Sequence, residues 1–137
     1  MALVYRIDRN AKLVVAAGYG TLTDADLFRY ERETGARSDM IGYDELIDVS
    51  SVTDIDVASE ERMENLAAEA AARDAFHGPA KLAIVAPGEF AFGLGRIFQI
   101  HRRVEPGSTK NVGVFRTMDA ALEFLGIDHP LDLPGLE

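Results

Sequence analysis

The stretch KLAIVAPGEFAFGLGRIF, residues 81–98, decides the fold. Its first six residues are almost all apolar, which is typical of a strand buried on both faces of a sheet. Gly88 then makes a turn, and a helix is expected to continue from there to about Val104. We therefore expect residues 81–86 to form the centre of a sheet covered by this helix. The side chains expected to face the sheet recur at helical spacing, and they are Phe90, Leu94, Ile97, Ile100 or His101, and Val104.

Strand and helix patterns alternate on both sides of this stretch. Strands are expected at 3–8, 12–20, 45–49 and 111–116, and helices at 24–36, 59–76 and 118–126. Such alternation implies right-handed crossovers and a mostly parallel sheet. We predict an α/β fold with a mixed, mostly parallel five-stranded sheet, an antiparallel N-terminal strand and about four helices. One domain is expected over residues 1–137, with 128–137 as an extended tail.

Charge and composition exclude several classes of partner. The 137 residues include 23 acidic and 14 basic side chains, for a formal net charge of -9. Such a chain repels a phosphate backbone, so we expect neither nucleic acid nor an anionic membrane as partner. It contains no cysteine, no signal-peptide pattern and no apolar run of membrane-spanning length. A cytoplasmic location is therefore expected.

The glycines of the opening stretch imitate a phosphate-binding loop. Gly88 and Gly93 enclose four residues as a P-loop does, but Leu94 and Gly95 replace the lysine and the hydroxyl residue that contact phosphate and magnesium. The dinucleotide fingerprint fails as well, because Phe98 occupies the position of its third glycine. No nucleotide or other cofactor is expected.

Two interpretations of this helix start remain. Its residues can simply pack a helix against the sheet. Alternatively, Gly93 and Gly95 permit the close approach of a ligand, and Arg96 neutralises its anionic group. The residues proposed for such a site are Phe90, Phe92, Gly93, Arg96 and Phe98.

No catalytic or metal-binding pattern stands out. The histidines, His77, His101 and His129, lack the spacing of metal ligands, and no serine lies in a nucleophile elbow. Acidic side chains follow the strand at 45–49, where α/β proteins bind ligands, and they are Asp48, Asp54 and Asp56. They could transfer protons together with Ser59, but Asp54, Asp56 and Ser59 are also the residue types that turns and helix caps prefer. Turn and cap roles are favoured, and neither catalytic residues nor a metal site is expected.

The segment LIDVSSVTDIDVAS, residues 46–59, resembles the STAS fold of anti-sigma-factor antagonists. Residues 3–127 resemble the SpoIIAA-like family of small bacterial STAS-related proteins, some of which are grouped with the lipid-carrying CRAL-TRIO domains. The likeness rests on the N-terminal strand pair, on Leu46-Ile47-Asp48 with its acidic loop, and on the blocks 81–86, 92–98 and 121–126.

The resemblance implies a regulatory loop, here represented by Asp48, Asp56 and Ser59. In such antagonists the serine directly after the aspartate is phosphorylated, and the added charge switches partner binding. Here Val57 follows Asp56, so the phosphoacceptor is missing, and Ser59 is expected to cap a helix.

These features predict a non-enzymatic regulatory or protein-interaction module of STAS type with an unidentified protein partner. The alternative is a protein that binds a small apolar anion, acyl or lipid-like, in the region of Phe92, Gly93 and Arg96. A homodimer is possible in either case, since symmetric dimers are the commonest assemblies.

Overall fold

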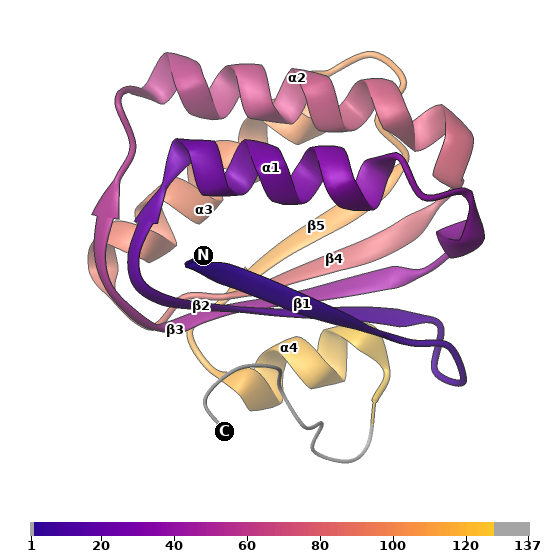
Figure 1. Ribbon diagram of the computed structural model, residues 1–137, viewed down its shortest axis with the longest axis horizontal. Coiled ribbons are helices and arrows are strands. Elements are labelled where there is room, and N and C mark those ends of the chain that lie inside the picture. The colour runs from indigo at the N-terminus through magenta and orange to yellow at the C-terminus, as the bar shows by residue number, and fades with distance from the viewer. Residues whose placement is uncertain (1, 128–137) are drawn as a thin grey trace.

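The computed structural model describes residues 2–127, whose strands form one five-stranded sheet in the order β1-β2-β3-β4-β5 (Figure 1). The strands are β1 (Leu3–Asp8), β2 (Leu13–Thr23), β3 (Asp44–Asp56), β4 (Ala80–Val85) and β5 (Lys110–Phe115). The helices are α1 (Asp24–Gly35), α2 (Glu60–His77), α3 (Glu89–Val104) and α4 (Met118–Leu125), with a short 3-10 helix at Ser38–Met40. β1 runs antiparallel to β2, and the other neighbouring pairs are parallel. The predicted sheet, its antiparallel N-terminal strand and the four helices are confirmed, whereas the tail predicted at 128–137 lies outside the described residues.

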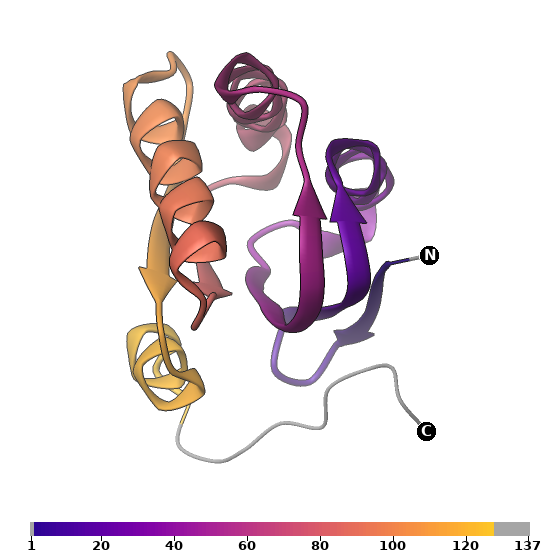
Figure 2. The ribbon, with the colours of Figure 1, turned by 90° about the vertical axis from the view of Figure 1, so that its left-hand side faces the viewer.

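The helices are divided unequally between the two faces of the sheet. Figures 1 and 2 show α1, α2 and α3 on one face and α4 alone on the other. Successive residues of a strand point to opposite faces, so Ile47 joins the larger apolar cluster with Phe98 of α3, and Leu46 joins a smaller one with Leu122 of α4. The larger cluster lies under three helices, and the site described below lies within it.

Polar caps begin three of the helices where the sequence predicts them. The Thr23 hydroxyl accepts a hydrogen bond of 3.2 Å from the Asp26 amide, and the Asp26 carboxylate accepts one of 3.0 Å from the Thr23 amide. This capping box fixes the start of α1. Ser59 and Thr117 cap α2 and α4 with their side chains, and Gly126, at φ 75°, ends α4.

β3 is longer than the strand predicted at 45–49. Its last residues pair with the end of β2, with Asp54 opposite Thr21 and Asp56 opposite Thr23. The assignment of Asp54 and Asp56 to turns is therefore wrong, because the two strands continue as a ribbon whose polar side chains are exposed to water. β3 is also the middle strand. The expectation that residues 81–86 form the centre is wrong by one strand, although β4 has a neighbour on each side.

The face that α3 buries agrees only in part with the predicted stripe, of which Leu94 and Ile97 pack against the core. Phe90, Ile100 and Val104 are exposed, and the buried residues include Gly95, Phe98, Gln99 and Arg102. Gly95 allows the helix to approach β5 closely, since a Cβ there would lie only 2.9 Å from Val114 Cγ1. Gln99 is buried because its amide donates a hydrogen bond of 2.7 Å to the carbonyl of Val112. Polar residues with partners on other elements therefore share the buried face with the apolar residues of the stripe.

Candidate functional site

An apolar cavity of about 100 Å³ lies between the sheet and the layer formed by α1, α2 and α3. Its apolar lining consists of Leu22, Leu27, Ile47, Val49, Ile55, Val57, Met63, Leu66, Leu82, Ile84, Ala91, Leu94, Gly95 and Phe98. Large side chains at a crossing of several elements leave this space unfilled. It is smaller than the engineered cavity of about 150 Å³ that binds benzene in another protein.

One end of the cavity lies at the carboxyl ends of β3 and β4. Here Ile55 of β3, Leu27 of α1 and Ala91 of α3 are only half-buried, so this end is nearest to solvent. In open α/β sheets ligands bind beyond the carboxyl ends of the parallel strands. The cavity therefore occupies the common ligand position of this class of fold.

The opposite end of the cavity is polar, and Tyr30, Glu31, Glu45 and Arg102 form it. Glu45, near the start of β3, is buried, and it accepts hydrogen bonds from the Tyr30 hydroxyl at 2.8 Å and from the Lys110 ammonium. Burial alone would raise the pKa of Glu45, but the Lys110 charge and the Tyr30 hydrogen bond hold the pKa below its usual value. Burial and the Glu45 carboxylate together raise the pKa of Tyr30 well above its usual value. Glu45 is thus held as a carboxylate and Tyr30 as a neutral hydroxyl.

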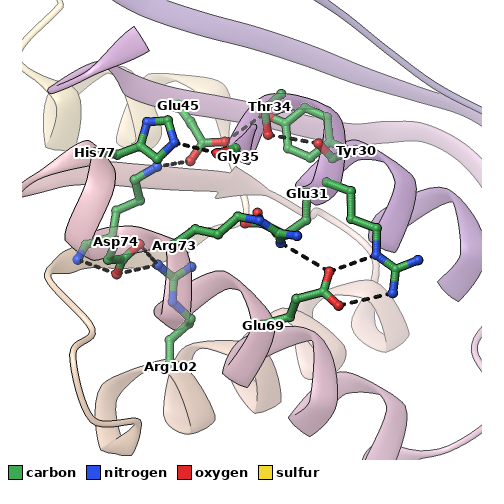
Figure 3. Close-up of polar contacts among 12 residues, drawn as sticks. Tyr30, Glu31, Thr34, Gly35, Glu45, Glu69, Arg73, Asp74, His77 and Arg102 are labelled. Carbon is green, nitrogen blue, oxygen red and sulfur yellow. Dashed lines mark hydrogen bonds and ion pairs between the residues drawn. The ribbon is translucent and has the colours of Figure 1, made fainter. Parts of the chain in front are cut away.

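Arg102 of α3 is the most deeply buried charged group at this end, with 2% of its surface exposed. Its Nη2 donates to both oxygens of Asp74 on α2, at 2.7 and 2.8 Å (Figure 3). Asp74 also accepts hydrogen bonds from the amides of Thr109 and Lys110. The Nε of Arg102, in contrast, is buried and has no hydrogen-bond partner. A buried donor without a partner is uncommon.

Of the two acidic residues that line this end, Glu31 of α1 has the less stabilised carboxylate. Figure 3 shows Arg73 reaching from α2 toward both Glu31 and Glu69, at 3.3 and 3.2 Å. Burial, and then the nearby Glu45 carboxylate, raise the pKa of Glu31 to about 7, although Arg73 opposes the shift. Glu31 therefore changes its protonation state near neutral pH.

The residues that the sequence proposed as a ligand site are only partly brought together. Phe98 lines the cavity, but Phe90 is exposed, and nothing would lie within 4 Å of a Cβ at Gly93. Phe92 packs against the Arg116 guanidinium, 4.0 Å from its ring centre. Arg96 is exposed and has no ion pair within residues 2–127. Of the two glycines in this part of α3, Gly95 is the one with a tight contact, and that contact is with Val114 of β5.

The residues proposed as a regulatory loop are separate from the cavity lining. Asp48 is buried and accepts hydrogen bonds from the amide and hydroxyl of Ser50, at 2.9 and 2.6 Å. Asp56 ends β3, and Ser59 accepts a hydrogen bond from the Arg62 amide as the cap of α2. Ser59 therefore has the cap role that the sequence predicts.

Sequence reasoning missed the polar end of the cavity altogether. The only signals were an acid at the start of a predicted strand, Glu45, and two charged residues within predicted helices, Asp74 and Arg102. None of these points to its partner without the fold.

Residues 2–127 contain neither a candidate membrane span nor a candidate metal cluster. None of the helices is long and apolar enough to cross a membrane. No group of three or more His, Asp or Glu side chains there could hold a metal ion.

The order of the strands and the placement of the helices define a SpoIIAA-like fold. A solved structure of an uncharacterised protein from the DUF3478 family of Shewanella loihica PV-4, described as having this fold, superimposes with a TM-score of 0.54. The alignment covers 90% of this chain and 94% of that chain, at 17% sequence identity. No protein-family model matches the chain, and no curated protein matches it. The predicted resemblance is confirmed as a likeness of fold.

Proposed function

We propose that this protein is a non-enzymatic binding module that holds a small, largely apolar ligand in the cavity between the sheet and α1–α3. The observation that carries the proposal is the cavity itself, which is apolar along its length and polar at one end. Pockets of this composition are the usual ligand sites of proteins, since apolar walls supply affinity and a few polar groups fix orientation. The arginine that lines this cavity is Arg102, whereas the sequence suggested Arg96 as the partner of an anionic ligand.

The size of the cavity limits the ligand. A space of about 100 Å³ accommodates only a small molecule, with roughly three to five carbon atoms. Long acyl chains would require α3 to move away from the sheet.

A titration with n-butanol, followed by amide chemical shifts in two-dimensional NMR, tests the proposal. The neutral alcohol should produce saturable shifts at residues that line the cavity, among them Leu94 and Gly95. The matched control is Ala91→Leu, because the longer side chain fills the cavity from α3. The variant should fold and give no saturable shifts. Equal shifts in both proteins, or none in the wild type, would contradict the proposal.

A second candidate function, a protein-interaction module, has its own observation. The outer face of α3 exposes Phe90, Ile100 and Val104, at 62%, 50% and 71% of their surface. Exposed apolar side chains along one helix are typical of contact surfaces. Ile100→Glu distinguishes the candidates: it should abolish association with a protein partner, including dimerisation measured by light scattering, and leave butanol binding unchanged. A monomeric wild type that is unaffected by this substitution would count against the second function.

A further inference from the structure

The outer face of α3 has the apolar pattern of one helix of a coiled coil. Phe90, Ile100 and Val104 are exposed, and Gly93 and the half-buried Ile97 lie between them along the helix. The spacing of these five residues alternates between three and four, as it does for the positions of a coiled coil that face the partner helix. We call residues 90, 93, 97, 100 and 104 the α3 seam, which extends over about 21 Å of helix.

The position of α3 leaves the seam open to a partner. Figure 2 shows α3 as an outer helix of the layer above the sheet, and its packed sides contact α2 and β5. The seam lies on another side of the helix, where residues 2–127 leave Phe90, Ile100 and Val104 more exposed than any other side chains of α3 of their size and apolarity. A second helix can therefore lie along the seam without displacing an element of the fold.

Gly93 has no explanation within residues 2–127. Glycine lowers the stability of a helix interior relative to alanine, so a helical glycine needs a reason. At Gly95 the reason is the contact with Val114, but nothing would lie within 4 Å of a Cβ at Gly93. Glycine permits the close approach of another backbone. Gly93 forms a notch in the seam, between Phe90 and Ile97, into which a side chain of a partner helix can pack.

The two flanks of the seam differ in charge. Arg96 and Arg103 lie along one flank, seven residues and thus about two turns apart. Both are exposed, and neither has an ion pair within residues 2–127. On the other flank His101 lies 3.7 Å from Glu60 of α2. The arginine flank is therefore complementary to acidic residues that recur every two turns in a partner.

A second copy of this chain does not supply those acids. If two α3 seams met in antiparallel orientation, Arg96 of one copy would approach Arg103 of the other, and in parallel orientation the arginines would approach the flank of His101. Glu89, the acid of α3 at the start of the arginine flank, already pairs with Arg116 at 3.2 Å. The charges of the flank therefore select a different chain.

We propose that the α3 seam binds an amphipathic helix of another protein, with apolar residues at alternating spacings of three and four and with acidic residues along one flank that pair with Arg96 and Arg103. The inference rests on the second candidate function, the protein-interaction module, and names the chemistry of its partner. It is independent of the ligand cavity, because none of the five seam residues lines that cavity.

The probes are two synthetic helical peptides of three heptads each. Both have leucine at the two seam positions and glutamine along one flank, and the other flank carries glutamate in the first peptide and lysine in the second. Each peptide is labelled with a fluorophore, kept at nanomolar concentration and titrated with the full chain, and binding is followed by fluorescence anisotropy. The salt concentration is about 0.15 M, at which charges more than about 8 Å apart are largely screened.

The glutamate peptide should bind about fivefold or more tightly than the lysine peptide, although the net charge of -9 favours lysine. Arg96→Gln combined with Arg103→Gln should remove this preference by weakening binding of the glutamate peptide about fivefold. The matched control is Arg32→Gln, which removes the same charge from the exposed side of α1 and should leave both affinities unchanged.

Gly93→Gln tests the notch without threatening the fold. Glutamine is the better helix former, and nothing within 4 Å opposes a Cβ at this position, so the variant should be at least as stable as the wild type in urea denaturation. Its longer side chain fills the notch and should weaken binding of the glutamate peptide about tenfold. An exposed glycine without a partner would not have this effect.

Three results would overturn the inference while leaving the second function intact. They are equal affinity for the two peptides, tighter binding of the lysine peptide, and undiminished binding of the glutamate peptide by Gly93→Gln. Binding of neither peptide would also overturn the inference, and the second function would fail with it only if Ile100→Glu also left association of the protein unchanged in light scattering. Butanol binding is unaffected by each of these results, because it reports on the cavity.

Discussion

The two glycines of α3 allow a paired test of how closely this helix packs on the sheet. Nothing would lie within 4 Å of a Cβ at Gly93, whereas a Cβ at Gly95 would lie 2.9 Å from Val114 Cγ1. In a helix interior alanine is more favourable than glycine by about 0.8–1.0 kcal/mol. Gly93→Ala should therefore raise the free energy of unfolding by up to about 1 kcal/mol.

Gly95→Ala has the same gain in helix propensity but also an added steric cost. Forcing one methyl group into a packed contact costs about 1–3 kcal/mol, so the net result should be a loss of about 1 kcal/mol. Val114→Ala removes the contacting methyl groups. In the double variant the penalty at Gly95 should disappear, with a coupling energy of about 1–2 kcal/mol.

Urea denaturation followed by far-ultraviolet circular dichroism measures these differences, since the chain has no tryptophan. Equal slopes of the free energy against urea concentration would show that the variants unfold in the same way. If Gly95→Ala stabilised the protein as much as Gly93→Ala, the contact with Val114 would not limit the approach of α3 to β5.

Three further substitutions, together with the control Glu69→Ala, test the buried polar groups and the cap of α1. Glu31→Gln should stabilise the protein by up to about 3 kcal/mol at pH 8 and have little effect near pH 4.5. The reason is that the pKa of Glu31 in the folded state lies above its value in the unfolded state, so wild-type stability falls as pH rises from about 4.5 to about 7. A gain in stability that did not vary with pH in urea denaturation would contradict this prediction. Asp74→Ala leaves Arg102 buried and unpaired, so it should lower the free energy of unfolding by about 3–5 kcal/mol in urea denaturation. The control Glu69→Ala removes a partly exposed ion pair with Arg32 and should lower the free energy of unfolding by about 1 kcal/mol or less. Thr23→Ala removes the cap of α1 and should lower the free energy of unfolding by about 1 kcal/mol, and no loss would mean that the capping box is not formed in solution.

The fold could be predicted from the sequence because its signals are local. The alternating strands and helices, the caps at Thr23, Ser59 and Thr117, and the apolar run at 81–86 each depend on neighbouring residues. The length of β3 could not be predicted in this way. Its final residues, with Asp54 and Asp56, have a polar pattern typical of turns, and only their pairing with β2 makes them a strand.

The candidate site could not be predicted because it depends on contacts between distant elements. The cavity is the space that side chains of β2, β3, β4 and three helices leave unfilled, and no segment carries a pattern for it. Arg102 lies in a segment of α3 whose apolar residues suggested a different buried face, and its burial depends on Asp74 of α2. The sequence predicted a ligand site at the start of α3, and of the residues in that prediction Phe98 lines the cavity.

The most direct test of the cavity as a ligand site is a crystal structure of the protein grown with n-butanol. The alcohol should occupy the space between the sheet and α1–α3 that Leu94, Gly95 and Phe98 line. A cavity that is empty or filled only with water, with butanol absent or confined to the outer surface, would contradict the account.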